Sequence, residues 1–279
     1  EIEALLSEVF GGYALVTPSS TLAHQIALPV LATEKDAIVF DHQAHRSVQV
    51  GTTLARAGGA TVELVRHSRL EEAAGIVRRL AAKHRTVWFA TDGVFSMYGD
   101  LAPVQLLRQL LDVAPNVRLY VDDAHGMSWA GPNGRGSFLS RMPVTERIVL
   151  ATSFAKGFGA GGGCLVFASE REREHVRLTG GPYVFSGPMQ PPMMGAVLAG
   201  ARVHLSPEID VLQARLRARV DLTNASLQDA GLPLLAVNES PIFFVETGKP
   251  RVAFQIAEAM ARDGFYLNVS ATIIAGRMV

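Results

Sequence analysis

Short, continuously apolar runs alternate with longer amphipathic stretches through most of this chain. The apolar runs are Tyr13–Thr17, Ala37–Asp41, Ala60–Arg66, Thr86–Ala90, Leu119–Asp122, Ile148–Ser153 and Cys164–Ala168. Between them lie stretches such as Arg69–Lys83 and Val104–Val113, in which apolar residues recur at helical spacing. Buried strands that alternate with helices are typical of a mostly parallel sheet covered by helices on both faces. We therefore predict a large α/β domain over residues 13–187.

The pattern changes on either side of this region. Residues 1–12 are predicted to be the end of a helix, which Gly11-Gly12 terminates. The chain starts inside that helix without a methionine, so we expect it to be part of a longer protein. Residues 188–279 are predicted to form a linking helix and an incomplete, smaller α+β domain. Its predicted elements are the helices Met189–Val203, Ile209–Asp229 and Arg251–Asp263 and the strands Pro241–Glu246 and Phe265–Val269.

Charge and hydropathy exclude several classes of partner. Lys and Arg together number 26, as do Asp and Glu, and this balance gives none of the basic surplus that nucleic-acid binding requires. No apolar run reaches the roughly 18 residues of a membrane span, and no signal peptide opens the chain. Cys164 is the single cysteine, so no intrachain disulfide can form. We expect a cytoplasmic protein.

Polar segments follow several of the predicted strands, where ligands collect in α/β sheets. The first segment includes Ser20 and Thr21, ahead of a short predicted helix over Leu22–Leu28 that Pro29 should end. Hydroxyl residues at a helix start leave N–H groups free for a phosphate, although an ordinary helix cap has the same composition. In the second segment, His45 could stack on an aromatic cofactor or shuttle protons, or simply cap the next helix.

The third and fourth segments carry the strongest chemistry. Asp122 ends an apolar strand, where a carboxylate is costly unless it meets a cation such as a pyridinium N–H, and His125 follows it. A metal ion is the rival, but no further cluster of ligands completes such a site, and we predict none. Lys156 precedes a glycine-rich turn, where a partly desolvated lysine can form a Schiff base; the alternative is a surface lysine beside a loop. A Schiff-base lysine, an acid for a ring nitrogen and a phosphate cradle together make a pyridoxal-phosphate (PLP) site.

Three motifs resemble those of the α-oxoamine synthases, a branch of the fold-type I PLP enzymes. They are Thr91–Asp100, Val121–Gly126 with the glycines Gly131, Gly134 and Gly136, and Ser153–Gly159. They occur in the family's order and at similar spacing, and the resemblance covers nearly the whole chain. It implies the fold-type I PLP-dependent transferase fold, with a mostly parallel central sheet.

The resemblance also implies a role for each matching residue. Lys156 corresponds to the lysine that carries the cofactor, and Asp122 to the partner of the pyridine nitrogen. His125 and Ser96 correspond to residues at the ring oxygen. His45 corresponds to the histidine that stacks on the ring, although the family pattern Ser-His-Ala-Ser is here Ala-His-Arg-Ser.

Other matching residues correspond to the phosphate site. Ser153 corresponds to a hydroxyl residue that touches the phosphate, and Ser20 and Thr21 stand where the family has a glycine and an aromatic residue. Phe185–Pro188 corresponds to a segment that reaches the phosphate of the neighbouring subunit, which implies a homodimer with shared active sites.

The implied reaction condenses an amino acid with an acyl thioester, from acyl-CoA or an acyl-carrier protein. Carbon dioxide is lost and an α-amino ketone forms. The family's carboxylate-binding arginine is expected outside this chain. Two alternatives stay open: a fold-type I aminotransferase that uses the same lysine and aspartate without a thioester, and a non-catalytic PLP-fold subunit.

Overall fold

The computed structural model describes residues 1–270, 273–274 and 277–278. The chain divides into two compact units. The first unit comprises Glu1–Ser96 and Asp100–Leu216, and the second comprises Met97–Gly99 and Arg217–Val279. Every residue predicted for the site belongs to the first unit.

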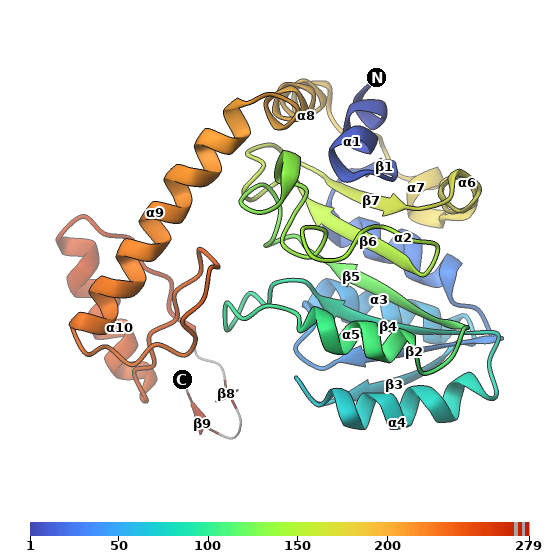
Figure 1. The fold of residues 1–279 in the computed structure, drawn as a ribbon, viewed down its shortest axis with the longest axis horizontal. Coiled ribbons are helices and arrows are strands. Elements are labelled where there is room, and N and C mark those ends of the chain that lie inside the picture. Colours follow the sequence, from blue (N-terminus) through green and yellow to red (C-terminus); the bar gives the residue numbers. More distant parts are fainter. Residues whose placement is uncertain (271–272, 275–276, 279) are drawn as a thin grey trace. The chain divides into compact units, whose positions relative to one another are not determined.

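One mixed sheet forms the centre of the first unit (Figure 1). Its strand order is β1-β7-β6-β5-β4-β2-β3. The strands are β1 (Tyr13–Thr17), β2 (Asp36–Asp41), β3 (Thr61–Val65), β4 (Thr86–Asp92), β5 (Val117–Asp122), β6 (Ile148–Ser153) and β7 (Gly163–Phe167). Strand β7 runs antiparallel to both of its neighbours, whereas the other paired strands of this sheet are parallel. The predicted mostly parallel sheet is confirmed.

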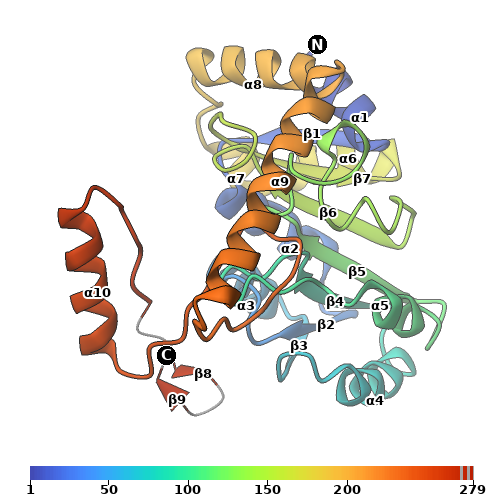
Figure 2. The same ribbon diagram turned by 60° about the vertical axis from the view of Figure 1, so that its left-hand side comes forward.

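Helices cover both faces of this sheet. In both views α2 (Ser20–Leu31) and α3 (Arg46–Ala57) lie on one side, and α4 (Leu70–Ala81) and α5 (Val104–Leu111) lie on the other (Figure 1 and Figure 2). Successive strand residues point to opposite faces, so each strand supplies both layers of core. In β4, for example, Trp88 packs in the core on the α2–α3 side and Phe89 in the core on the α4–α5 side.

The remaining helices of the first unit lie near the β1 end of the sheet (Figure 1). They are α1 (Ile2–Phe10), α6 (Glu170–Thr179), α7 (Gly181–Phe185) and α8 (Pro191–His204), and α9 (Glu208–Asp229) begins in this unit. The predicted linking helix thus starts two residues later than expected, at Pro191, whose ring is well accommodated at a helix start.

Helix α2 differs from the sequence-based expectation that Pro29 would end it. The helix continues to Leu31, and the N–H of Ala32 still donates to the carbonyl of Leu28 at 3.0 Å. Proline removes one N–H group from the helix, but it does so here in the last turn, where little of the helix remains to be disturbed. Leu28 and Leu31 are buried in the core, and this packing keeps the last turn in place.

The second unit contains the end of α9, helix α10 (Pro250–Arg262) and the short pair β8 (Ile273–Ile274) and β9 (Arg277–Met278). Two predicted strands are wrong. Pro241–Glu246 contributes only a single bridge, between Val245 and Leu234, and Phe265–Val269 forms no strand. A strand requires a hydrogen-bonding neighbour, and the described residues supply none for Phe265–Val269. No helix among the described residues is both long and apolar enough to cross a membrane.

Candidate functional site

The strand register brings the predicted site residues to one edge of the sheet. Asp92 of β4 is paired with Asp122 of β5, which is paired with Ala151 of β6. Because β7 runs the opposite way, its first residue, Gly163, is paired with both Ser153 at the end of β6 and Thr17 at the end of β1. The segments that contain Ser20, His45, Ser96, His125 and Lys156 therefore all leave or enter the sheet at the edge where Asp122 lies.

Asp122 is 5% exposed, and each of its two carboxyl oxygens contacts a nitrogen. Its Oδ1 accepts a hydrogen bond from the backbone N–H of Ala124 at 3.0 Å. Its Oδ2 lies 3.0 Å from Nε2 of His24. Burial alone would raise the pKa of Asp122, but His24, the charge of Lys156 and the Ala124 N–H outweigh burial and lower the pKa. The edge of the sheet thus holds a buried carboxylate.

Sequence reasoning missed two residues behind Asp122. His24 of α2 is fully buried, and its Nδ1 lies 2.9 Å from the hydroxyl of Tyr120 in β5. The sequence does contain a signal for both. Tyr120 and Asp122 are two residues apart in a strand and so share a face. His24 is a polar residue among the buried apolar residues of α2.

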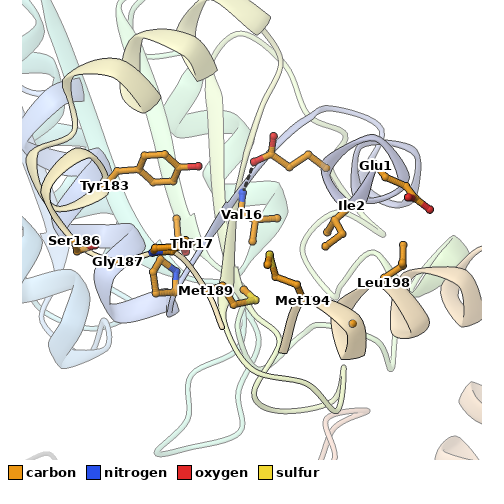
Figure 3. A pocket seen from close by; sticks show the side chains of 14 residues that line it. Glu1, Ile2, Val16, Thr17, Tyr183, Ser186, Gly187, Met189, Met194 and Leu198 are labelled. Carbon is orange, nitrogen blue, oxygen red and sulfur yellow. Dashed lines mark hydrogen bonds between the residues drawn. The ribbon is translucent and has the colours of Figure 1, made fainter. Parts of the chain in front are cut away.

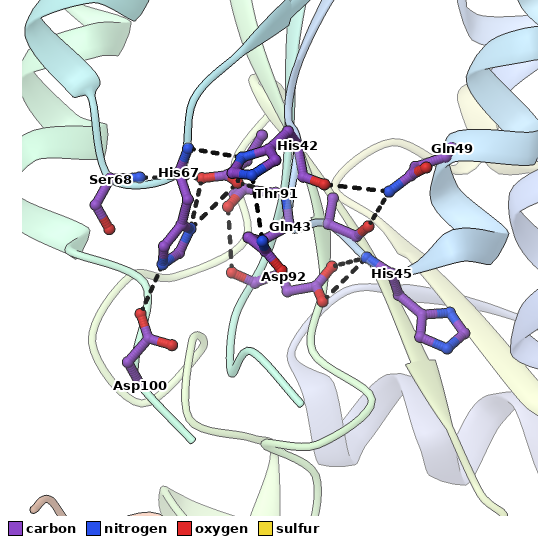
Figure 4. Close-up of polar contacts among 11 residues, drawn as sticks. His42, Gln43, His45, Gln49, His67, Ser68, Thr91, Asp92 and Asp100 are labelled. Carbon is purple, nitrogen blue, oxygen red and sulfur yellow. Dashed lines mark hydrogen bonds and ion pairs between the residues drawn. The ribbon is translucent and has the colours of Figure 1, made fainter. Parts of the chain in front are cut away.

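Asp92 is a second buried carboxyl group beside Asp122. Its two oxygens accept hydrogen bonds from the backbone N–H of His45 at 3.1 and 3.2 Å (Figure 4). Burial and the adjacent charge of Asp122 raise the pKa of Asp92 well above its usual range. The two neighbouring carboxyl groups therefore differ, and the negative charge resides on Asp122.

His45 caps α3. Its ring Nδ1 accepts from the Ser47 N–H at 3.3 Å and lies 2.6 Å from the Ser47 hydroxyl. The capping role that the sequence left open is therefore present. The ring points away from the Asp92 carboxyl group (Figure 4), and the residue is exposed. The His45 ring caps α3 and is still exposed at this edge, so it is available to a ligand.

Lys156 follows β6 in a turn where the Gly159 N–H donates to the Lys156 carbonyl at 3.0 Å. The residue as a whole is exposed, yet the protein around part of its side chain lowers the pKa of the amine. Asp122 and Asp92 oppose this shift, which places both carboxyl groups within electrostatic reach of Lys156. Partial desolvation favours the neutral, nucleophilic amine.

His125 lies between Asp122 and the next loop and is partly buried. Burial and the charge of Lys156 lower the pKa of its imidazole to about 4. His125 is therefore neutral near pH 7 and can donate one hydrogen bond and accept another. Its backbone carbonyl accepts from the indole N–H of Trp129 at 2.6 Å, which fixes the chain on either side of the ring.

The predicted phosphate cradle lies at the start of α2. Ser19 caps the helix, and its hydroxyl accepts from the Leu22 N–H at 3.1 Å. Within the described residues, the N–H groups of Ser20 and Thr21 have no acceptor. A Cβ atom on Gly163 would lie 2.5 Å from the Ser20 nitrogen, so only glycine lets β7 pass this close. Free N–H groups at a helix start suit an anion.

Two further predicted residues line the same edge. Ser153 is buried at the end of β6, and its hydroxyl accepts from the Ala155 N–H at 3.2 Å. Ser96 is partly buried in the turn after β4, next to the Phe95 N–H that donates to the Asp100 carbonyl at 2.9 Å.

Among the residues with described positions, no group of three or more His, Cys, Asp or Glu side chains is arranged to hold a metal ion.

Asp123, next to Asp122, anchors the loop that carries His125. Its Oδ2 accepts from the Phe138 N–H at 2.8 Å, and Gly93, Gly126 and Gly136 surround the carboxyl group. A Cβ atom on Gly126 would lie 2.1 Å from Oδ1 of Asp123. Burial raises the pKa of Asp123 to about 7. This carboxyl group is fully packed in the protein and has a structural role.

Helix α8 fastens the two loops that carry His125 and Lys156. The His204 ring stacks on Phe158, two residues after Lys156, with 4.5 Å between ring centroids. Its Nε2 lies 2.9 Å from the Ser128 hydroxyl, three residues after His125. Ser128 has a φ of 77°, a conformation that this contact helps to hold.

A second polar cluster lies at the ends of β2 and β3 (Figure 4). Nδ1 of His67 lies 3.0 Å from Oδ2 of Asp41, and Nε2 lies 3.1 Å from Oδ2 of Asp100. Burial opposes a charge on His67, but hydrogen bonds to Asp100 and Asp41 outweigh it and raise the pKa to about 9. The cluster ties the Asp100 segment to the sheet.

One cavity of about 750 Å³ lies beside the phosphate cradle (Figure 3). Its lining includes Thr17 and Pro18 at the end of β1, together with Ser186, Gly187 and Met189. Asp122 and Lys156 are not part of the lining. The cavity therefore adjoins the candidate site without containing its charged residues.

Comparisons with known proteins agree with this geometry. The family model "Aminotransferase class I and II" matches residues 3–273. An 8-amino-7-oxononanoate synthase of Dechloromonas aromatica is 32% identical over 262 residues, which are 92% of this chain and 66% of that protein. One of Geobacter sulfurreducens is 30% identical, over 96% of this chain and 68% of that protein. The chain thus spans about two thirds of the length of these curated relatives.

Solved structures share the fold. A serine palmitoyltransferase of Sphingomonas wittichii superimposes with a TM-score of 0.86 at 26% identity, over 96% of this chain and 65% of that one. An 8-amino-7-oxononanoate synthase of Francisella tularensis has a TM-score of 0.80 at 21% identity, over 96% and 76% of the two chains.

Proposed function

Because the chain belongs to the class I and II aminotransferases and, within them, to the α-oxoamine synthases, we propose that it is a PLP-dependent enzyme that joins an amino acid to an acyl thioester. The observation that carries the proposal is the buried, ionised carboxylate of Asp122 at the same sheet edge as the partly desolvated amine of Lys156. These are the two groups that the cofactor's ring nitrogen and aldehyde require.

The residues present fit PLP. Lys156 would bind its aldehyde carbon and Asp122 its ring N–H. The free N–H groups of Ser20 and Thr21, with the hydroxyl of Ser153, would hold its phosphate. His45 would cover one ring face, while His125 and Ser96 would contact the ring oxygen. The carboxylate of Asp122 would meet the cationic ring nitrogen, and the N–H groups at the start of α2 would meet the anionic phosphate. The charges of the site and the cofactor are therefore complementary.

Bound PLP supplies an electron-withdrawing ring that accepts charge from the amino acid's Cα. In the chain itself, Lys156 in its neutral form takes the Cα proton. Asp122 keeps the ring nitrogen protonated, because an adjacent anion favours the cationic form. His125, neutral near pH 7, hydrogen-bonds the ring oxygen without adding charge.

The proposed reaction forms a carbon–carbon bond between Cα and the acyl carbon. The thioester's sulfur leaves as a free thiol, the amino acid's carboxylate leaves as carbon dioxide, and an α-amino ketone is the product. The acyl thioester is an acyl-CoA or an acyl-carrier-protein thioester.

We also propose a homodimer. Phe185 is 89% and Val184 49% exposed, and both belong to the segment next to Ser186 and Gly187. Exposed apolar side chains beside a binding site are typical of a protein interface. A second copy placed here would bring its chain close to the phosphate cradle of the first.

The test is a pair of product measurements on the PLP-loaded protein. The protein is incubated with a panel of amino acids and acyl-CoA, and free thiol and carbon dioxide are measured. We expect thiol release that requires both substrates. Release of a keto acid without thiol would instead identify an aminotransferase and contradict the proposal, and the absence of both products would favour a non-catalytic subunit.

A further inference from the structure

A buried pair of side chains lies behind Asp122. His24 comes from α2 and Tyr120 from β5, and both are fully buried. Nε2 of His24 lies 3.0 Å from Oδ2 of Asp122, and Nδ1 lies 2.9 Å from the Tyr120 hydroxyl. The imidazole thus bridges a phenol and the carboxylate that would face the cofactor nitrogen. Buried polar groups of this kind are costly unless they are paired with one another.

The hydrogen-bond partners assign the protons. Within the described part of the chain, the Tyr120 hydroxyl hydrogen-bonds to His24 alone, and a buried O–H group must donate to an acceptor. Burial raises the pKa of Tyr120 well above its usual range, so the phenol keeps its proton. Nδ1 of His24 is then the acceptor, and Nε2 carries the ring hydrogen and faces Asp122.

From this geometry we infer that Tyr120 and His24 are positioning residues that hold Asp122 ionised and aimed at the cofactor's ring nitrogen. The inference rests on the proposed PLP function. Nε2 of His24 contacts one oxygen of Asp122 and Nδ1 contacts the Tyr120 hydroxyl, so the imidazole is held from both sides. The contact with His24 stabilises the ionised carboxylate of Asp122.

Removal of His24 would leave Oδ2 of Asp122 buried without a donor. The carboxyl group would then hold its own proton in the free protein, because burial raises its pKa and the contact with His24 that opposes burial would be gone. The charge of Lys156 opposes that change. Other titratable groups that interact with Asp122 are His45, His125, Asp123 and Tyr120. The ring nitrogen of PLP would then meet a neutral carboxyl group in place of a carboxylate, so PLP would bind more weakly and its nitrogen would be less protonated.

The experiment compares PLP with a carbocyclic analogue that has C–H in place of the ring nitrogen. Dissociation constants for both are measured on the apoprotein, for wild type and for His24→Leu. We expect His24→Leu to weaken PLP binding about tenfold, as loss of a hydrogen bond to a charged group would. Binding of the analogue, which has no nitrogen to engage Asp122, should stay within about twofold of wild type.

Two further variants distinguish loss of the contact with Asp122 from a general loss of packing. His24→Gln restores an N–H donor and should recover most of the PLP affinity. Tyr120→Phe removes a single oxygen atom and should weaken PLP selectively, by less than His24→Leu. Trp88→Phe is the matched control, since it breaks another buried contact between the sheet and α2, the 3.1 Å hydrogen bond from Trp88 to the Leu31 carbonyl. It should change the two affinities equally or not at all.

A direct readout is the ¹⁵N NMR shift of PLP labelled at its ring nitrogen. We expect a pyridinium shift in wild type and a shift toward neutral pyridine in His24→Leu. Equal losses for PLP and the analogue, or an unchanged shift, would overturn the inference. If His24→Leu does not fold, unchanged PLP selectivity in Tyr120→Phe has the same force. A wild-type protein that binds no PLP would instead refute the proposed function itself.

Discussion

Asp92 and Asp122 are neighbours across β4 and β5, yet the protein shifts their pKa values in opposite directions. Asp122 receives an N–H donor, the His24 ring and the field of Lys156, whereas Asp92 receives one backbone N–H and is repelled by Asp122. The pair therefore carries a single negative charge, on the carboxylate of Asp122. At the scale of residues, the proposed chemistry depends on this separation.

Asp122→Asn tests the role of that charge. An amide has nearly the same shape but no charge, so it would not keep the ring nitrogen protonated. We expect PLP still to bind and kcat to fall at least about a hundredfold, as when a preorganised charge contact is removed. Asp123→Asn is the matched control, because Asp123 is the adjacent buried carboxyl group and accepts from the Phe138 N–H within the loop. Near-normal turnover in Asp122→Asn would contradict the assignment.

His67 gives a prediction about pH and stability. Its pKa of about 9 in the folded protein exceeds the value of roughly 6.5 expected in the unfolded chain. The ion pairs with Asp41 and Asp100 therefore contribute fully below about pH 6.5, and their contribution is lost as the pH rises to about 9. We expect His67→Gln to lower the free energy of unfolding near pH 6.5, with a loss that shrinks toward pH 9.5. Urea unfolding across this range measures it, and a pH-independent loss would be inconsistent with a charged His67.

At the scale of elements, the sequence predicted the strands of the main sheet well because each is a local feature. Apolar β-like runs mark β1 and β6 with the bounds observed, and the others within two residues. The candidate site residues were predicted for the same reason, since they follow these strands in the sequence. The His24–Tyr120 contact was missed because it joins residues 96 positions apart, and no local pattern encodes which helix residue meets which strand residue. The prediction of a strand at Phe265–Val269 was wrong for a similar reason. A strand needs a neighbouring strand to pair with, and hydropathy does not reveal whether one is present.

The close packing of Gly93, Gly126 and Gly136 around Asp123 predicts that a larger residue at these positions destabilises the fold. A Cβ atom at Gly126 would lie 2.1 Å from Oδ1 of Asp123, a distance that no real contact allows. We expect Gly126→Ala to displace the His125 loop and to lower the free energy of unfolding by about 2 kcal/mol or more. Gly75→Ala in α4, where nothing lies within 4 Å of the new atom, should raise stability by about 0.5–1 kcal/mol. Thermal unfolding of both variants measures these changes in stability. Equal effects of the two substitutions would show that the close packing of Gly126 against Asp123 is unimportant.

At the scale of the whole molecule, the homodimer proposal predicts that Phe185 is covered in solution. Phe185→Ser should shift the protein toward the monomer and weaken PLP binding, since the same segment lies beside the phosphate cradle. Leu222→Ser is the control, because Leu222 is 67% exposed on α9 outside that segment. Sedimentation velocity measures the mass. A wild-type protein that sediments as a monomer would contradict the proposal.

The proposed chemistry depends on one covalent bond, between Nζ of Lys156 and the cofactor's aldehyde carbon. Reduction of the PLP-loaded protein with borohydride makes that bond permanent, and digestion followed by mass spectrometry locates the pyridoxyl group. We expect the label on the peptide that contains Lys156. A label on Lys35, Lys83 or Lys249, or on no lysine, would contradict it.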